Sequence, residues 1–186
     1  MRADAPLLVV ALGEEADALD DTLPVLVTGP GKVNAATAVA AALAAARPVA
    51  VLNVGTAGGL RDGMHGIHEV GTVIQHDFDA AAFRALVGRD YGDPIVLADA
   101  AAPGVVLATG DCFVTDTALR SRLAVEAHLV DMEGYAVAWA ARAAGVPVRL
   151  VKLVSDDAGD GALRTWTETV DAHSRALAQW VREQLL

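Results

Sequence analysis

The fold class follows most directly from residues 49–59, VAVLNVGTAGG, a short apolar run that ends in a cluster of glycines. The apolar part, Val49–Val54, is too short for a helix, and its continuous apolarity is typical of a strand buried on both faces. An alanine-rich helical pattern, Lys32–Ala46, precedes it, and Arg47-Pro48 ends that helix. The stretch therefore predicts a helix, then a buried strand, then a glycine-rich turn.

The same alternation continues along the whole chain. Further strands are predicted at Leu7–Leu12, Leu23–Thr28, Val70–Ile74, Val105–Thr109 and Val148–Val154. Further helices are predicted at Glu14–Asp21, Asp79–Val87, Asp116–Ala127, Glu133–Ala144 and Ala162–Leu186. Because alternating strands and helices are typical of α/β folds, we predict a three-layer α/β/α sandwich with a central mixed, largely parallel sheet. At about 150 residues per domain, the 186 residues form a single domain, 1–186.

Composition excludes several classes of protein. The chain has 14 basic and 24 acidic residues, and its net charge of −10 opposes binding to a nucleic acid. Hydrophobic residues make up 54% of the chain, which excludes disorder. The longest weakly polar stretch, Ala35–Ala46, is shorter than the roughly 20 residues that span a bilayer, so no membrane partner is expected. A single cysteine, Cys112, excludes an internal disulfide and fits a reducing compartment. The apolar run Leu7–Leu12 is not followed by a signal-peptide cleavage site, so we predict a cytoplasmic protein.

Two glycine motifs fail the tests for nucleotide-binding loops. The glycines of residues 55–59 differ in spacing from the dinucleotide fingerprint, and Arg61-Asp62-Gly63 does not open a helix. In Gly29-Pro30-Gly31-Lys32, the next residue is Val33, where a P-loop needs a serine or threonine for magnesium. Neither ATP nor NAD is therefore predicted, and no cofactor is expected.

Carboxylates follow three of the predicted strands, at the sheet edge where α/β proteins bind ligands. They are Glu14-Glu15, Asp131-Met132-Glu133 and Ser155-Asp156-Asp157. A helix start would also explain Glu14 and Glu15, because carboxylates suit the positive end of a helix dipole, and helix capping would explain Asp131. Two adjacent aspartates at a buried edge favour protonation of one of them, which makes a general acid.

Residues 65–79 contain several side chains that can bind metals. They are His65, His68, Glu69, His76, Asp77 and Asp79. Their spacing matches no zinc pattern, so we interpret them as loop residues and predict no metal site; the role of His76, Asp77 and Asp79 stays open. Cys112 has no neighbouring signature that would activate it, and we interpret it as a bystander.

Six segments, taken in order, resemble the purine nucleoside phosphorylase/hydrolase superfamily, and most of all its methylthioadenosine/S-adenosylhomocysteine nucleosidases. The segments are Ala11–Glu15, Gly29–Ala35, Asn53–Leu60, Gly110–Phe113, Val130–Glu133 and Val154–Asp156. The short motifs are weak alone, but together they cover nearly the whole chain. The resemblance implies hydrolysis of the N-glycosidic bond of a purine nucleoside, with release of the free base and sugar.

The resemblance also implies a role for each site residue. Glu15 would activate the attacking water, Asp156 would protonate N7 of the purine, and Ser155 would orient Asp156. Glu133 would bind the ribose hydroxyls above Met132, and the remaining contacts to sugar and base would come from Thr56, Ala57, Gly58, Phe113 and Val114. These residue types suit the reaction, because bond cleavage builds positive charge on the sugar and negative charge on the leaving base.

The choice between water and phosphate depends on cations. Phosphorylase relatives carry an arginine just before the glycine-rich turn, where this chain has Leu52-Asn53-Val54, and the acidic Gly13-Glu14-Glu15 would repel a dianion. Water is therefore the predicted nucleophile, with a 5′-methylthioadenosine/S-adenosylhomocysteine-type nucleoside as substrate. Futalosine or a 6-oxopurine nucleoside as substrate, a phosphorylase and a non-catalytic nucleoside sensor stay open as alternatives.

Two segments are shorter than in members of the family that the chain resembles. Asp20–Pro24 directly joins the first helix to the second strand, and Gln75–Asp79 leads quickly into a helix. In relatives these regions shape the pocket for the 5′ substituent, so the sequence does not identify that group. The resemblance also implies a homodimer in which a neighbouring copy completes the pocket.

Overall fold

The computed structural model describes residues 5–19, 22–97 and 104–185. The strands in these ranges are β1 Leu7–Val10, β2 Val25–Val27, β3 Val51–Gly59, β4 Ile67–Gln75, β5 Ile95–Val96, β6 Val105–Thr109, β7 Leu129–Asp131 and β8 Val148–Asp156. The helices are α1 Gly13–Ala16, α2 Lys32–Ala45, α3 Ala80–Val87, α4 Thr117–Leu123, α5 Gly134–Ala143 and α6 Ala162–Leu185.

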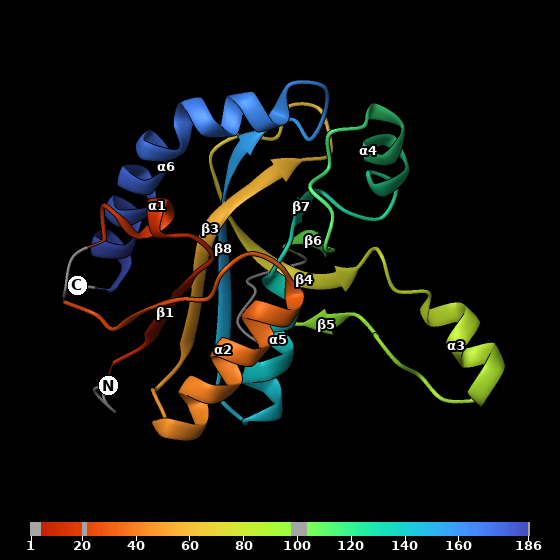
Figure 1. Cartoon of the computed structure of the whole chain (residues 1–186), viewed down its shortest axis with the longest axis horizontal. Coiled ribbons are helices and arrows are strands. Elements are labelled where there is room, and N and C mark those ends of the chain that lie inside the picture. The colour runs from red at the N-terminus through yellow and green to blue at the C-terminus, as the bar shows by residue number, and fades with distance from the viewer. Residues whose placement is uncertain (1–4, 20–21, 98–103, 186) are drawn as a thin grey trace.

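The strands form one mixed sheet that closes on itself (Figure 1). β3 pairs with β8 and β7, β4 pairs with β8 and β6, and β6 pairs with β7, so these five strands make a ring. β1 and β2 extend the sheet from β3, and β5 extends it from β4. Five of the eight strand pairs are parallel, which confirms the predicted mixed, largely parallel α/β sheet. The closure into a ring was not predicted.

Helices cover both faces of β1. Successive side chains of a strand point to opposite faces, and Leu7 packs with α2 and α5 while Leu8 packs with Val181 of α6. Figure 1 shows α2 and α5 together on one side, with α6 and α1 on the other. Burial on both faces explains why the predicted strands are apolar throughout rather than at alternate positions.

The glycine-rich segment after Val54 is part of strand β3, which corrects the predicted turn. Residues 55–58 pair with β8, with a bulge between Ala57 and Gly58. A Cβ on Gly58 would lie only 2.9 Å from the Cβ of Ala158. The glycines therefore let neighbouring side chains pack closely against the backbone of β3, rather than forming a tight turn. β8 correspondingly continues to Asp156 instead of ending at Val154.

Several other boundaries differ from the prediction. The first strand ends at Val10, and α1 has only four residues. Residues 20 and 21, the end of the longer helix predicted there, lie outside the described ranges. Residue 186, the end of the last predicted helix, also lies outside them. α4 ends at Leu123 rather than Ala127. Strands β5 and β7 were not predicted, because two or three residues are too few to show a periodicity.

Helix α3 projects from the body of the molecule between β4 and β5 (Figure 1). It begins after Asp79, whose Oδ1 accepts a hydrogen bond from the Ala82 N–H at 2.9 Å. None of the α3 residues is buried. As for membranes, the described helices include none that combines the length and the apolarity needed to cross one.

Candidate active site

A cavity of about 250 Å³ lies where β3, β7 and β8 end, beside the residues that follow β1 and the first turns of α6. Its walls include all ten predicted site residues: Glu15, Thr56, Ala57, Gly58, Phe113, Val114, Met132, Glu133, Ser155 and Asp156. They also include residues that the sequence analysis did not assign to the site: Ala11, Leu12, Pro30, Cys112, Val130, Asp131, Ala158, Leu163 and Trp166. Segments that are far apart in the sequence thus meet at one site.

Glu15 is buried and accepts four hydrogen bonds. The backbone N–H groups of Ala11 and Leu12 donate to Oε2 at 3.2 and 3.3 Å. The backbone N–H and the hydroxyl of Thr56 both donate to Oε1 at 2.8 Å. A Cβ on Gly55 would lie 3.2 Å from Oε1, so this glycine leaves space for the carboxylate. Because a solvated helix start would leave Glu15 exposed, its 4% exposure favours a role inside the cavity.

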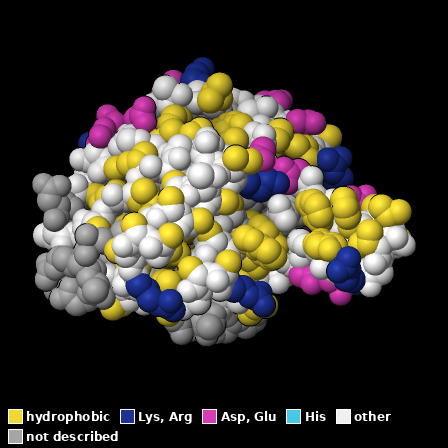
Figure 2. Space-filling model, turned by 60° about the horizontal axis from the view of Figure 1, so that its bottom comes forward, with side chains coloured by type: hydrophobic (Ala, Val, Ile, Leu, Met, Phe, Trp, Pro, Cys, Tyr) yellow, Lys and Arg dark blue, Asp and Glu magenta, His cyan; other side chains and the backbone are white. Residues whose placement is uncertain are grey.

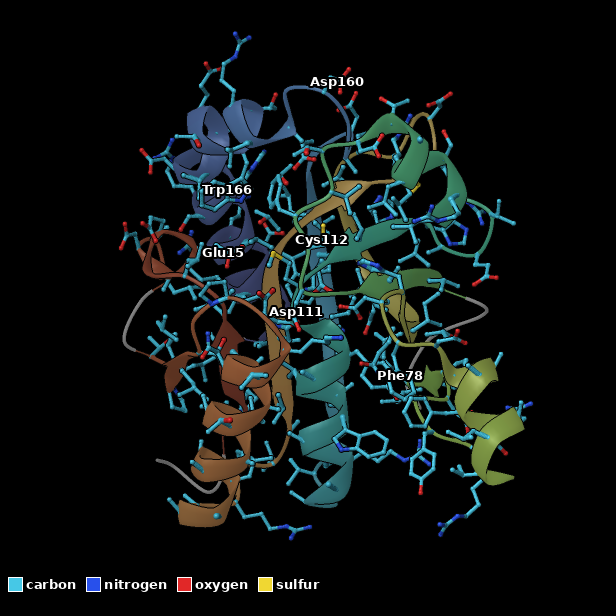
Figure 3. The ribbon with its side chains drawn as sticks, turned by 45° about the vertical axis from the view of Figure 1, so that its right-hand side comes forward. Glu15, Phe78, Asp111, Cys112, Asp160 and Trp166 are labelled. Carbon is cyan, nitrogen blue, oxygen red and sulfur yellow. The ribbon has the colours of Figure 1, made fainter. Side chains whose placement is uncertain are left out.

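Trp166 adds a further hydrogen bond to this group. Its indole Nε1–H donates to Thr56 Oγ1 at 3.0 Å, and the ring lines the cavity. Figure 3 shows Trp166 on α6 near Glu15, facing the segment that carries Cys112. The sequence offered no signal for this residue, because it lies among the polar residues that open a long amphipathic helix.

A buried ion pair lies beside the second glutamate of the cavity. Lys152 Nζ is 2.9 Å from Asp131 Oδ2, and both side chains are only 2% exposed. Asp131 also accepts hydrogen bonds from the Thr109 hydroxyl at 2.6 Å and from the Gly134 N–H at 2.9 Å. The predicted helix-capping role of Asp131 therefore accounts for its bond to the Gly134 N–H but not for its ion pair with Lys152. In the sequence, Lys152 is only a charged residue within an apolar strand.

Glu133 is 8% exposed, and the Gly31 N–H donates to its Oε1 at 2.8 Å. Burial, together with the nearby Asp131 carboxylate, raises the pKa of Glu133 from 4.5 to about 7, although Lys152 and the Gly31 N–H act in the opposite direction. Burial alone would lower the pKa of Lys152, but the surrounding carboxylates, Asp131 first, raise it above its ordinary value. Lys152 is therefore charged at neutral pH, while Glu133 titrates close to neutral pH.

The loop that supplies the Gly31 N–H is held by a group of charged residues. The backbone N–H of Lys32 donates to Asp111 Oδ1 at 2.7 Å, and its ammonium pairs with Asp77. The Asp111 N–H donates to Asp77 Oδ2 at 2.9 Å. Burial alone would raise the pKa of Asp77, but Lys32 holds it below its ordinary value. Asp77, whose role the sequence left open, thus joins the start of α2 to the segment before Phe113.

Asp156 is half-buried and accepts two hydrogen bonds. The Ser155 hydroxyl donates to Oδ2 at 2.7 Å, and the Ala158 N–H donates to Oδ1 at 2.8 Å. Asp157, by contrast, is exposed to solvent. The expectation that Asp157 and Asp156 share a buried edge is therefore wrong, because the side chain of Asp157 faces solvent, where water screens its charge, although the next residue, Ala158, is buried.

The remaining cavity residues are mostly apolar. Val114 is buried, Met132 is half-buried, and the Phe113 ring is 40% exposed. Among the described residues that line the cavity, none is an arginine, lysine or histidine. No cluster of three or more histidine, cysteine, aspartate or glutamate side chains suitable for a metal ion occurs in the described ranges. His173 on α6 interacts with the Asp156 carboxylate, and burial lowers the pKa of His173 although Asp156 acts in the opposite direction.

The fold and the cavity define an α/β protein that can bind a small molecule at the ends of its strands with carboxylates and apolar side chains. Residues 19–183 match the sequence model of the Phosphorylase superfamily, and the chain belongs to this family. Glu15 precedes the matched segment.

Individual relatives are similar over most of their length. A 5′-methylthioadenosine/S-adenosylhomocysteine nucleosidase of Exiguobacterium sp. strain AT1b is 30% identical over 190 residues, with 84% of this chain and 77% of the relative covered. The enzyme of the same name from Geobacillus sp. strain WCH70 is 29% identical, with the same coverage.

Solved structures share the fold. The S-adenosylhomocysteine nucleosidase of Streptococcus pyogenes in complex with 5-methylthiotubericidin has a TM-score of 0.81 at 25% identity, and the match covers 100% of this chain and 99% of that one. Native futalosine hydrolase of Helicobacter pylori strain 26695 has a TM-score of 0.83 at 20% identity, with 97% and 96% covered.

Proposed function

We propose that this protein hydrolyses the N-glycosidic bond of a purine nucleoside and releases the free base and the sugar. One observation carries the proposal: besides Asp131, which is paired with Lys152, three carboxyl side chains, Glu15, Glu133 and Asp156, line a single cavity whose described walls contain no cationic side chain. The named relatives support the same reaction. They also favour a nucleoside of the 5′-methylthioadenosine/S-adenosylhomocysteine type as substrate.

In the proposed reaction, the oxygen of a water molecule attacks the anomeric carbon, and a proton of the water passes to Glu15. The carbon–nitrogen bond breaks, and its electron pair goes to the purine, whose N7 takes a proton from Asp156 as the general acid. Carboxylates close to the sugar stabilise the positive charge that develops there. This division of work between a base that holds water and an acid resembles that of inverting glycosidases.

Glu133 is proposed to bind the ribose hydroxyls. Among the described residues, Gly31 donates the one hydrogen bond that Glu133 accepts, so its second oxygen can accept bonds from the substrate. Met132 and Thr56–Gly58 would contact the sugar and base, and Phe113 at the exposed edge of the cavity would stack on the purine. The backbone of Val114 would contact the Watson–Crick edge of the base, and Ser155 would orient Asp156 through their 2.7 Å hydrogen bond.

Water rather than phosphate is the proposed nucleophile. A phosphate dianion needs cationic donors, of which arginine is the most suitable. The nearest buried cation is Lys152, and it is already paired with Asp131 at 2.9 Å. Buried carboxylates such as Glu15 and Glu133 would repel a dianion in the same cavity.

The test is base release from 5′-methylthioadenosine, S-adenosylhomocysteine, futalosine and inosine, each with and without phosphate. We expect release of free adenine and free sugar in phosphate-free buffer. A requirement for phosphate with formation of a sugar 1-phosphate would contradict hydrolysis. Tight binding of nucleosides with no base release would indicate a sensor.

We also propose that the protein forms a homodimer through α3. The arm of residues 78–91 exposes large apolar side chains to solvent: Phe83, Leu86, Val87 and Tyr91 are 42–78% exposed. Figure 2 shows hydrophobic side chains gathered on the projecting part of the molecule. Contiguous exposed apolar groups of this kind mark interaction surfaces, and a second copy is the partner that the family relationship favours.

Light scattering on purified protein tests the dimer. We expect twice the 19.1 kDa chain mass for the wild type and a shift to monomer for Leu86→Glu. Val125→Glu is the matched control, because Val125 is 79% exposed, close to the 78% of Leu86, but lies after α4. A wild-type monomer with full activity, or an equal effect of both substitutions, would refute the role of α3.

A further inference from the structure

We propose that Trp166 is a positioning residue for Glu15, acting through the hydroxyl of Thr56. The inference rests on the proposed function of Glu15 as the base that accepts a proton from water. Three groups form a chain of hydrogen bonds: the indole N–H of Trp166, the hydroxyl of Thr56, and the carboxylate of Glu15.

The direction of this chain is fixed by chemistry. An indole nitrogen can only donate, and a threonine hydroxyl has one proton and two acceptor lone pairs. Thr56 Oγ1 accepts from Trp166 at 3.0 Å, so its own proton is available for Glu15 Oε1 at 2.8 Å. Trp166 therefore determines where the Thr56 oxygen lies and leaves its proton free to rotate.

That freedom matters because the four hydrogen bonds of Glu15 fill the roughly four lone-pair sites of a carboxylate. Three of the donors are backbone N–H groups that cannot rotate. A water can donate to Oε1 only if the hydroxyl of Thr56 turns away, and the turned hydroxyl can then donate to the oxygen of that water. Trp166 holds the Thr56 oxygen in place in both orientations.

Helix α6 contacts the segment around Glu15 at a second point, and this contact fixes the position of the helix relative to Glu15. The Ser174 hydroxyl donates to the backbone carbonyl of Glu15 at 3.0 Å and accepts from the Ala18 N–H at 3.1 Å. Trp166 and Ser174 are about 12 Å apart along the helix at 1.5 Å per residue. One helix thus fixes the backbone of Glu15 directly and its carboxylate through Thr56.

The experiment compares Trp166→Phe, which removes the N–H and keeps an aromatic ring, with Trp180→Phe as a control on the same helix. Trp180 is outside the cavity and packs near Arg149. We expect Trp166→Phe to lower kcat about tenfold with KM changed less than about threefold, as for loss of one hydrogen bond. Trp180→Phe should leave both constants near wild type. A Trp166→Phe enzyme with wild-type kcat would overturn the proposal.

A double-mutant cycle with Thr56→Val separates positioning from direct contact with the substrate. If Trp166 acts through Thr56, adding Trp166→Phe to Thr56→Val should change kcat by less than about twofold. Additive losses would show that the indole acts on the substrate itself and would overturn the proposal. Thr56→Ser, which keeps a hydroxyl, should restore the sensitivity to Trp166→Phe.

A measurement without turnover keeps this inference distinct from the proposed function. In ¹⁵N-tryptophan-labelled protein, the indole N–H signal of Trp166 is assigned by its loss in Trp166→Phe. We expect this signal to move in Thr56→Val and the Trp180 signal to stay in place. If the wild type hydrolyses no nucleoside, the proposed function fails while this result still tests the contact. An unmoved Trp166 signal overturns the inference even in an active enzyme.

Discussion

Glu15 follows β1 and Glu133 follows β7, and both are buried glutamates on the wall of the same cavity. Glu15 accepts four hydrogen bonds, three of them from backbone N–H groups. Glu133 accepts one from the described residues, and its pKa is raised by burial and by Asp131 to about 7. Two buried glutamates on one cavity wall therefore differ in how many hydrogen-bond donors the protein directs at them.

The difference suits the two proposed roles. A base that accepts one proton from a water benefits from a fixed oxygen, and the backbone donors provide it for Glu15. A group that binds two sugar hydroxyls needs acceptor capacity that the protein has not already used, and Glu133 has that capacity. Each of the following changes should break or sharpen this comparison.

The largest effect is expected for Glu15→Gln. Loss of a positioned base should lower kcat by about 10²–10⁴-fold. The variant should also be less stable by about 1–3 kcal/mol, because one orientation of the amide places its NH₂ group against the Ala11 and Leu12 N–H groups and the other places it against the Thr56 N–H. Turnover is measured by base release, and stability by urea unfolding.

Glu14→Gln is the matched control, since Glu14 is the exposed neighbour in the same short helix. It should change neither quantity. A Glu15→Gln enzyme with near-normal turnover would return Glu15 to the role of a helix-start carboxylate.

Asp156→Asn should lower turnover by about 10²-fold or more while leaving the fold intact. The amide oxygen can still accept from the Ala158 N–H, and the Ser155 hydroxyl can rotate to accept from the new NH₂ group. The loss should be large for adenine nucleosides and smaller for 4-nitrophenyl riboside, whose leaving group needs no proton. Equal losses with both substrates would mean that Asp156 only orients the base.

Lys152→Met should destabilise the protein by about 3–5 kcal/mol, because it leaves the buried Asp131 and Glu133 without their cation. Arg149→Met is the control on the same strand. Arg149 pairs with Glu69 at a solvent-exposed site, where loss of a pair costs at most about 1 kcal/mol. Urea unfolding at pH 7 compares the two, and equal effects would show that the buried pair is not critical.

The sequence predicted the α/β class because apolar runs mark buried strands, and the resemblance of its motifs to a known family named the ten residues that line the cavity. It did not predict the ring, since closure depends on pairs such as β4 with β8 that join distant segments. Trp166 and Lys152 were missed because their roles come from contacts with Thr56 and Asp131, which are far away in the sequence. The glycines near Gly58 were misassigned as a turn because local sequence does not show what packs against them.

The smallest expected effect is a pH dependence that belongs to Glu133. Its pKa is about 7 in the folded protein against 4.5 ordinarily, so the folded state binds the extra proton between these values. The contribution of Glu133 to stability is therefore complete below about pH 4.5 and is lost as the pH rises through 7.

Glu133→Gln should flatten the fall in unfolding free energy between pH 5 and 8, by at most about 1.4 kcal/mol per pH unit. Glu126→Gln, which alters an exposed glutamate, should leave the slope unchanged. In the wild type, KM should fall as the pH rises through 7, because the charged carboxylate accepts the sugar hydroxyls better. A slope in Glu133→Gln equal to that of the wild type would show that Glu133 does not titrate in this range, and the contrast with Glu15 would then rest on hydrogen-bond donors alone.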